Sequence, residues 1–491
     1  MSNRRPSQHS SLSTEAQTLV RSVISTKEAP LAGSLLDKLC ELGLKYARKQ
    51  LREKVPKGLL EQVSKEAMQS FEDSLGRTLA DAVAQCVDLY SNAFRSAATA
   101  LAITTAGLSA QAIHSYDAPL PAPELLLKLF REFRALPELW SDLIFAWCLR
   151  VKVFLLRLQA DRMVLTKSFF RGCPPAKVLQ LDADLSDPHN RGERVIALEF
   201  EAGPLIYKPR DGDGEWEWFA VLDWINREGY RPGFLTLKVL RRKGYCWMEQ
   251  IAPIQCKSRA EARRFYRRIG GLLCVAHLLR IVDCHCENMI AAGEYPVFVD
   301  TETLWHVNNA FSPNNDDTLL ETGLLPLPSS YPDSEYPCSP LGDIEPGPYT
   351  PCLNGEPLSA RRYVEEIERG FSQTWRWLLE NKMRRTVLTK RIRRIAEKQH
   401  RRIYWPTLKY MAIRDASLGP AAMKSSTRRY ALIRRWCQRD GVPASVIKEE
   451  VRAIARLDIP YFLRQSKGAA GLPDRALLQK SIRSLRNALC S

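Results

Sequence analysis

The sequence predicts an α+β protein in which a core of short strands separates two helical regions. Apolar residues recur at three- and four-residue steps from about Leu19 to Leu155, which is the spacing of amphipathic helices. Short apolar runs bounded by turn residues begin near Val178 and continue to Val299, which is typical of strands. From Ala360 onward the pattern is again helical and strongly basic. The fold class therefore follows from two changes of periodicity along one chain.

The same changes, together with composition, divide the chain into five predicted parts. These are a disordered tail (1–17), a helical region (18–177), a mixed core (178–310), an irregular segment (311–358) and a basic helical region (359–491). The tail is polar and lacks the apolar stretch of a signal peptide. The irregular segment is rich in Pro, Gly, Ser and Asp, and segments of this length are usually lids, binding loops or disordered.

Composition limits the classes of protein to consider. The thirteen cysteines are scattered without a C-x-x-C pair, and no segment is apolar enough to predict a transmembrane helix. We therefore expect a reduced, cytoplasmic protein. The net charge is +17, and basic residues crowd Lys382–Arg402, where Glu397 is the only acid. This run is either a solvated helix face or a surface for an anionic partner such as an acidic peptide. No nucleic-acid-binding signature accompanies it, so nucleic acid is not expected as a partner.

The elements of the core can be predicted individually. Runs at Arg194–Phe200 and Leu205–Lys208 flank a Gly-Pro turn and predict a hairpin that ends on Lys208. Ser258–Leu279 predicts an amphipathic helix, with Ser258 as N-cap and Glu261 completing a capping box. A loop at Val282–Asn288 should follow it. The other expected elements are a helix at Phe219–Gly229 and strands at Leu235–Leu240, Tyr245–Ile251, Met289–Ala292 and Val297–Val299.

Three of these elements carry residues that phosphoryl transfer requires. The reaction needs a cation to hold nucleotide phosphates, oxygen ligands for Mg²⁺, and a carboxylate to orient the attacking hydroxyl. Lys208 closes a strand, as the phosphate-binding lysine of kinases does. Asn288 follows Asp283 by five residues, the spacing of a kinase catalytic loop, and Asp300 follows the next apolar strand. The order and spacing together predict an ATP·Mg²⁺ site.

One feature makes the predicted site atypical of protein kinases. No glycine-rich G-x-G-x-x-G loop precedes Lys208; Asp211-Gly212-Asp213-Gly214 follows it instead. Glu249, near the end of a predicted strand, could pair with Lys208 or face solvent, and the sequence leaves both alternatives open.

Several strings together resemble one family, the N-terminal dehydratase domain of the type 2 (LanM) lanthipeptide synthetases. The resemblance extends from about Leu181 to Phe462 and implies an atypical, lipid-kinase-like two-lobed fold that uses ATP and Mg²⁺. It also implies a substrate, a ribosomally made precursor peptide with a leader. The strings are Ser186-Asp187-Pro188-His189, Tyr207-Lys208-Pro209-Arg210, Tyr245-Cys246-Trp247-Met248-Glu249, Asp283-Cys284-His285-Cys286-Glu287-Asn288, Asp300-Thr301-Glu302, Thr322-Gly323-Leu324-Leu325-Pro326, Arg401 to Thr407, and Asp458-Ile459-Pro460-Tyr461-Phe462.

The resemblance implies two chemical steps and assigns residues to each. A Ser or Thr of the peptide is phosphorylated, and the phosphate is then eliminated to leave dehydroalanine or dehydrobutyrine. For the first step, the matching residues are Lys208 at the phosphates, Asp283 as base or orienting group, His285 as its support, and Asn288, Asp300 and Glu302 at Mg²⁺. For elimination they are Asp187, His189, Arg401 and Thr407, with Arg401 expected in a helix-like basic run.

Departures from the family pattern leave alternatives open. Trp405 stands where the motif has another arginine, so a kinase that stops at the phosphorylated peptide remains an alternative. A non-catalytic subunit that binds the precursor is a second alternative. No cyclase-type zinc motif of Cys and His follows Phe462, so we do not expect ring closure by this chain. A separate cyclase or another modifying enzyme could act next.

Overall fold

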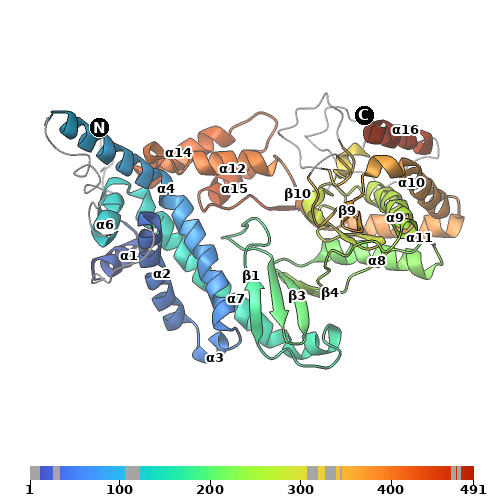
Figure 1. Ribbon diagram of the computed structural model, residues 1–491, viewed down its shortest axis with the longest axis horizontal. Coiled ribbons are helices and arrows are strands. Elements are labelled where there is room, and N and C mark those ends of the chain that lie inside the picture. The colour runs from blue at the N-terminus through green and yellow to red at the C-terminus, as the bar shows by residue number, and fades with distance from the viewer. Residues whose placement is uncertain are drawn as a thin grey trace, which may run out of the picture. The chain divides into compact units, whose positions relative to one another are not determined.

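A computed structural model describes residues 12–25, 34–104, 122–306, 319–326, 339–342, 345–465, 472 and 477–490. Contacts divide the chain into two compact units (Figure 1). The first comprises Met1–Gly203 and Tyr410–Pro460, and the second comprises Pro204–Lys409 and Tyr461–Ser491. The predicted basic C-terminal region thus contributes to both units. Most of the predicted tail and much of the predicted irregular segment lie outside the described residues.

The first unit is built mainly of helices. Apolar faces of α2, α4 and α7 pack against one another, and the indole nitrogen of the buried Trp147 donates a hydrogen bond to the carbonyl oxygen of Phe71 (2.9 Å). Ser34 and Asp37 form a reciprocal capping box at the start of α2. The helices are α1 (Thr14–Ser25), α2 (Leu35–Lys54), α3 (Lys57–Leu60), α4 (Lys65–Thr104), α6 (Ala122–Glu132), α7 (Ala135–Ser168), α12 (Thr407–Ala416), α13 (Pro420–Met423), α14 (Ser426–Cys437) and α15 (Ala444–Ile454).

A β-hairpin completes the first unit. Its strands, β1 (Val178–Asp182) and β2 (Ile196–Phe200), pair antiparallel with Leu181 opposite Leu198. The loop between them carries the predicted residues Asp187 and His189.

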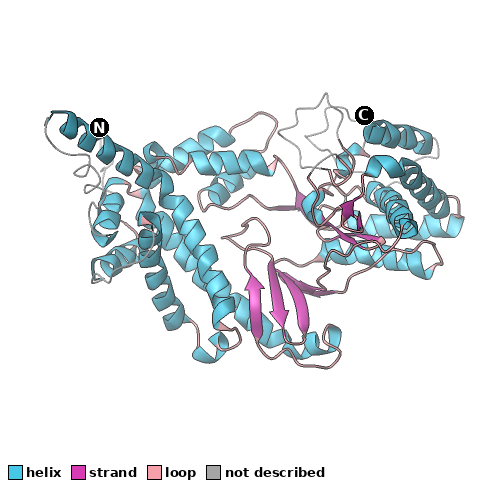
Figure 2. Ribbon diagram, viewed as in Figure 1, coloured by secondary structure: helices cyan, strands magenta, loops and turns pink. Residues whose placement is uncertain are grey.

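The second unit contains most of the strands (Figure 2). Central β5 pairs antiparallel with β3 on one side and with β4 on the other, which brings Lys208 opposite Cys246. The expected strand at Leu235–Leu240 begins later, at Val239. The strands are β3 (Gly203–Lys208), β4 (Val239–Arg242), β5 (Tyr245–Met248), β6 (Met289–Ala292), β7 (Tyr295–Phe298), β8 (Cys352–Leu353), β9 (Glu356–Pro357), β10 (Gln399–Arg402) and β11 (Phe462–Gln465).

The helices of the second unit include a very close pair, α9 and α10. Gly270 on α9 and Gly370 on α10 lie where the two backbones meet, because a Cβ atom at either position would lie 1.9 Å from a carbonyl oxygen of the other helix. The helices are α8 (Asp213–Arg227), α9 (Arg259–Leu278), α10 (Val364–Leu379), α11 (Lys382–Ala396) and α16 (Leu477–Cys490), with 3₁₀ turns at Cys286–Asn288, Leu320–Thr322 and Ala360–Tyr363.

The start of α9 confirms one half of the predicted capping box. The hydroxyl of Ser258 accepts the amide of Glu261 (3.3 Å), so Ser258 is the N-cap. The Glu261 carboxylate instead accepts the amide of Lys257 (2.7 Å), one residue before the expected donor.

The structure corrects the prediction that Arg401 lies in a helical run. Helix α11 ends at Ala396, and Arg401 lies in β10, which pairs antiparallel with β11 and places Arg401 opposite Leu463. The reason is a tertiary contact. Helical propensity alone would continue α11 through this basic run, but pairing with the distant strand β11 stabilises a strand here instead.

Two general expectations can be compared with the described residues. None of the helices described there is long and apolar enough to cross a membrane. Cys286 is disulfide-bonded, whereas Cys284 is a buried free thiol, so the expectation of a fully reduced chain is wrong at Cys286.

Candidate active site

The Lys208 ammonium is the centre of the candidate site in the second unit. It is buried at the end of β3 and lies 2.7 Å from Glu215 Oε1 on α8. It also donates to the carbonyl oxygen of Val299 (2.7 Å) and lies 3.5 Å from Asp300 Oδ1. Burial alone would lower the pKa of this ammonium, but Asp300 and Glu215 raise it above its ordinary value. Lys208 is therefore held as a fixed positive charge.

Glu215 was not predicted from the sequence. It occupies the position beside Lys208 that was one of the two alternatives considered for Glu249. The Glu249 carboxylate accepts the amide of Lys238 (3.1 Å) and makes no described contact with Lys208. Glu215 reaches Lys208 because α8 starts immediately after β3. The first turn of α8 packs on the Asp300 segment so closely that a Cβ atom at Gly214 would lie 2.5 Å from the carbonyl oxygen of Thr301. The glycine at position 214 is the sequence signal that could have indicated this approach.

Arg210 is a second residue that the predicted set lacked. Its Nη2 atom lies 2.7 Å from Asp300 Oδ1, and its Nε atom lies 2.7 Å from Glu302 Oε2. Burial would raise the pKa of the Asp300 carboxyl, but Arg210 and Lys208 hold it well below its usual range. Asp300 is thus ionised, as a carboxylate ligand of a metal ion must be.

Glu302 binds three side chains in the same cluster. Its oxygens contact Arg210, Nη1 of Arg401 and the hydroxyl of Tyr461 (2.9 Å). The backbone amide of Arg401 also donates to the carbonyl oxygen of Glu302 (3.1 Å), which attaches β10 to this segment. Arg401 is therefore largely buried beside the site rather than part of a solvated basic face.

The predicted catalytic loop lies beside this cluster. Asp283 has a left-handed backbone (φ 71°), a conformation that costs a non-glycine residue energy and that often occurs at functional sites. The side-chain amide of Asn288 donates to the carbonyl oxygen of Asp283 (2.8 Å), and the Cys284 amide donates to the Thr322 carbonyl oxygen (2.8 Å). His285 Nε2 lies 3.4 Å from Asp283 Oδ1. These bonds hold the loop in one shape.

The side chains present can be tested as a Mg²⁺ site. Mg²⁺ usually binds one or two protein oxygens together with nucleotide phosphates and water, so a closed cage of carboxylates is not needed. No group of three or more His, Cys, Asp or Glu side chains that could hold a metal occurs among the described residues. Asn288 and Asp300 nevertheless fit the role of Mg²⁺ ligands. They lie close together, because the backbone amide of Val299, the residue before Asp300, donates a hydrogen bond to the carbonyl oxygen of Asn288 (3.0 Å). The described contacts of the Asp300 carboxylate involve only its Oδ1 atom. Both oxygens of Glu302 are already bound, so Glu302 fits the metal role less well.

Two residues predicted for elimination belong to the first unit. His189 is buried; its Nδ1 atom lies 2.7 Å from the carbonyl oxygen of Ile459, and its backbone pairs with Glu193. Asp187 lies two residues before it on the same loop. The other two, Arg401 and Thr407, belong to the second unit. Thr407 is the first residue of α12, and the residues of this helix from Tyr410 onward belong to the first unit. Among the four residues predicted for elimination, Arg401 is the one that contacts Glu302 within the second unit.

Comparison with known proteins now adds family membership. Residues 134–348 and 341–465 match the model of a family described as "Domain of unknown function (DUF4135)". The chain belongs to this family. It is also similar to the lacticin 481/lactococcin biosynthesis protein LcnDR2 of Lactococcus lactis subsp. lactis, at 25% identity in a match that covers 56% of this chain and 35% of the relative's length. These findings bear out the resemblance to the LanM dehydratase region.

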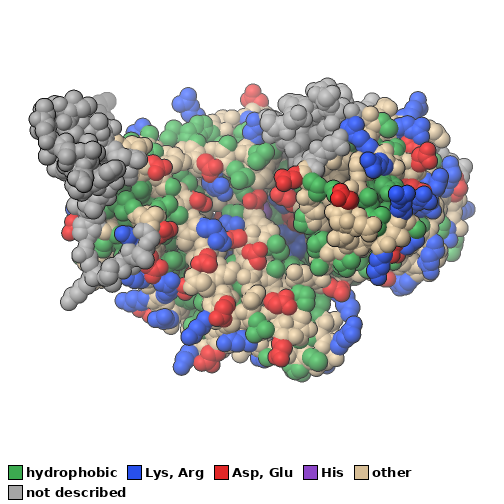
Figure 3. Space-filling view, viewed as in Figure 1, with side chains coloured by type: hydrophobic (Ala, Val, Ile, Leu, Met, Phe, Trp, Pro, Cys, Tyr) green, Lys and Arg blue, Asp and Glu red, His purple; other side chains and the backbone are tan. Residues whose placement is uncertain are grey.

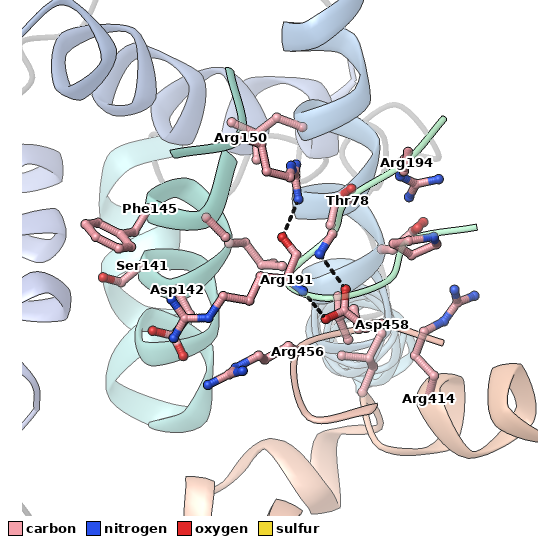
Figure 4. Close-up of a pocket in the computed structure, with 18 of the residues that line it drawn as sticks. Thr78, Ser141, Asp142, Phe145, Arg150, Arg191, Arg194, Arg414, Arg456 and Asp458 are labelled. Carbon is pink, nitrogen blue, oxygen red and sulfur yellow. Dashed lines mark hydrogen bonds between the residues drawn. The ribbon is translucent and has the colours of Figure 1, made fainter. Parts of the chain in front are cut away.

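The first unit of this DUF4135 protein also contains a cavity of about 260 Å³. Five arginines line it (Figure 4). The carboxylate of Asp458 accepts hydrogen bonds from the backbone amides of Arg191 and Gly192 (both 2.7 Å). Burial raises the pKa of the Asp458 carboxyl to about 6, although these amide bonds lower it. Pro188 lines the cavity, so the loop of His189 is fixed beside it. The arginines are Arg150, Arg191, Arg194, Arg414 and Arg456.

Proposed function

We propose that this protein is an ATP-dependent peptide dehydratase of the lanthipeptide type. It phosphorylates a Ser or Thr of a precursor peptide and then eliminates the phosphate. The observation that carries the proposal is the cluster of the buried pair Lys208 and Glu215 with the half-buried Arg210 and Asp300, beside the Asp283–Asn288 loop. The similarity to a lacticin 481/lactococcin biosynthesis protein supports a peptide as the substrate.

In the phosphorylation step, this chain would fix the phosphates and orient the hydroxyl. Lys208 holds a permanent positive charge for the nucleotide phosphates, and Glu215 fixes its position. Asn288 and Asp300 would supply oxygen ligands to Mg²⁺, which, when bound, neutralises phosphate charge. Asp283 accepts the proton of the Ser or Thr hydroxyl as its oxygen bonds to the γ-phosphorus and the bond to ADP breaks.

In the elimination step, a base takes the α-proton of the phosphorylated residue while the bond between Cβ and the phosphate oxygen breaks. The products are dehydroalanine or dehydrobutyrine and inorganic phosphate. The resemblance ties Asp187 and His189 to this step. Arg401 would stabilise the phosphate as it leaves, since a guanidinium binds phosphate oxygens bidentately. Thr407 would donate a hydrogen bond to the same phosphate.

Mass spectrometry of a precursor peptide tests the proposal. The full chain is incubated with ATP, Mg²⁺ and a Ser/Thr-rich precursor peptide encoded beside its gene. We expect loss of water from the peptide and loss of that activity in Asp283→Asn. Asp223→Asn is the matched control, because Asp223 is half exposed on the outer side of α8 and forms an i,i+4 pair with Arg227.

Two outcomes would redirect the assignment. A peptide that gains phosphate without losing water would indicate a peptide Ser/Thr phosphotransferase, the alternative that Trp405 keeps open. An unchanged peptide, together with no ATP binding in a parallel titration, would contradict both enzymes and favour a subunit that only binds the precursor.

A further inference from the structure

Helix α11 carries an unusual concentration of positive charge. Seven of its fifteen residues are basic and none is acidic. Figure 3 shows Lys and Arg side chains gathered on the part of the second unit where α11 lies. Leu388, Ile392 and Ile395 form its buried face, so the charges occupy the opposite, solvent-facing side.

Three of the seven basic residues have a structural role in the folded unit. Arg384 lies over the ring of Trp377 (3.8 Å to the centroid), and Arg391 lies over Trp224 (5.5 Å). Arg394 forms an ion pair with the buried Glu217 (2.8 Å). The other four are exposed, and their side chains have no ion pair or hydrogen bond with any residue that the structure describes: Lys382, Arg385, Lys390 and Arg393.

The positions of these charges work against the stability of α11. Its first turn holds Lys382, Arg384 and Arg385 at the positive end of the helix dipole, where acidic residues are favoured. Lys390 and Arg393 are like charges three residues apart, which also disfavours a helix. Packing of α11 does not require these four charges, and an anionic partner would relieve their repulsion.

An apolar side chain lies among the charges. Met383 is 78% exposed, the highest value among the large hydrophobic residues described. A flexible thioether side chain adapts to varied apolar partners. The combination fits a ligand with acidic and apolar residues, which is a peptide, better than it fits a nucleic-acid backbone, which offers phosphates to the basic residues but no apolar partner to Met383.

The α11 helix is also attached to the candidate site. Arg394 and Lys398 both bind Glu217 (2.8 and 3.1 Å), which lies on α8 two residues after Glu215, the partner of Lys208. After α11 the chain continues directly into β10, which carries Arg401. A peptide bound on α11 would therefore be held on the same compact unit as the candidate active site.

We propose that the exposed face of α11, formed by Lys382, Met383, Arg385, Lys390 and Arg393, is a docking surface for an acidic, partly apolar segment of the peptide substrate. This inference rests on one part of the proposed function, namely that the substrate is a peptide. Binding is measured without ATP, so failure of docking and failure of catalysis remain distinguishable.

Fluorescence anisotropy with the full chain tests the surface. The probes are a labelled peptide of alternating glutamate and leucine and the same peptide with glutamine for every glutamate. We expect the glutamate peptide to bind and the glutamine peptide to bind much more weakly. Replacing the four basic residues by alanine (K382A, R385A, K390A, R393A) should weaken binding of the glutamate peptide roughly tenfold, because each exposed ion pair contributes little alone. It should also reduce the dependence of binding on salt.

The matched control removes four exposed basic residues from the first unit: Lys49, Arg52, Lys57 and Arg131. It should change binding less than about twofold, since net charge alone acts weakly at physiological salt. Met383→Ser should weaken binding without changing its salt dependence. If the α11 variant binds like the unaltered protein, or the control loses as much affinity, the proposal is wrong. A labelled mixed-sequence RNA duplex that binds more tightly than the glutamate peptide, and loses affinity in the α11 variant, would also overturn it in favour of a nucleic-acid partner.

Discussion

The buried ammonium of Lys208 lies 2.7 Å from the carboxylate of Glu215, which is seven residues further along the chain and on the helix that follows β3. An ion pair this deeply buried stabilises its unit only while both charges remain, because removal of one leaves the other buried and uncompensated. In the proposed function, the pair would also fix where a positive charge is presented to nucleotide phosphates. The stability of the unit and the proposed chemistry therefore both depend on the contact between the Lys208 ammonium and the Glu215 carboxylate.

The first prediction concerns Glu215→Gln. Glutamine keeps a hydrogen-bond acceptor for Lys208 but removes the charge, so the ammonium should shift toward Asp300 and be misplaced for the phosphates. We expect the initial rate of peptide phosphorylation to fall roughly a hundredfold, since small misplacements of a positioning group have effects of this size. The rate is measured as phosphopeptide formed per minute at saturating ATP.

Glu228→Gln, at the exposed C-terminal end of α8, is the control for this change. It should leave the rate within about twofold, as surface substitutions usually do. A Glu215→Gln protein that phosphorylates at the normal rate would show that the position of Lys208 does not depend on Glu215.

The second prediction concerns Arg401→Lys. Lysine keeps the positive charge near Glu302 but cannot bind phosphate bidentately. We expect phosphorylation to change by less than about threefold and elimination to slow roughly a hundredfold, the usual cost of losing a donor to a developing anion. Phosphorylated peptide should accumulate in a time course read by mass spectrometry.

The control for Arg401→Lys is Arg464→Lys on the paired strand β11. It should leave the ratio of phosphorylated to dehydrated peptide unchanged. If Arg401 only stabilises the fold, through its contact with Glu302, both steps should slow equally and the melting temperature should fall as well.

The sequence predicted the local features of this site better than its long-range contacts. Lys208 at a strand end and Ser258 as a helix cap are confirmed, because both depend on residues close in the chain. The ion pairs of Arg210 and Arg401 were not predicted, since periodicity does not reveal which distant charges meet. The placement of Arg401 in a helix was wrong for the same reason: its strand partner, β11, lies far along the chain.

The third prediction concerns the pH dependence of stability. Burial raises the pKa of the Glu193 carboxyl to about 7, although Arg157 and Arg150 oppose the shift. A folded-state pKa above the ordinary value of 4.5 means that the folded state binds this proton more tightly. Its contribution to stability is therefore greatest at low pH and decreases as pH rises from about 5 to about 7.5.

Glu193→Gln removes this titration. Because the side chain is partly exposed, we expect a gain of only about 1–2 kcal/mol at pH 8 and no gain at pH 5. Melting temperatures at the two pH values measure it, with the exposed Glu61→Gln as control. A gain of equal size at both pH values would contradict the assignment of the effect to ionisation.

The fourth prediction concerns the close contact of α9 and α10, of which α9 directly precedes the Asp283 loop in the chain. A Cβ atom at Gly270 would lie 1.9 Å from the carbonyl oxygen of Ile367 and 2.7 Å from the amide nitrogen of Phe371. Both are backbone atoms, so no side-chain rotation can relieve the clash and the helices must separate. Gly270→Ala should therefore cost about 3 kcal/mol of stability, the upper part of the range for overpacking, even though alanine favours a helix.

Gly58→Ala is the matched control, since nothing lies within 4 Å of a Cβ atom at this helical glycine. Alanine there should leave stability unchanged or raise it slightly, because it restricts the unfolded chain without a clash in the folded one. Thermal melts of both variants, with hydrogen exchange of the α9 amides to locate the effect, compare the two positions. If Gly270→Ala melts like Gly58→Ala, then the two helix backbones do not approach this closely in solution, because a methyl group 1.9 Å from a carbonyl oxygen could not be accommodated without loss of stability.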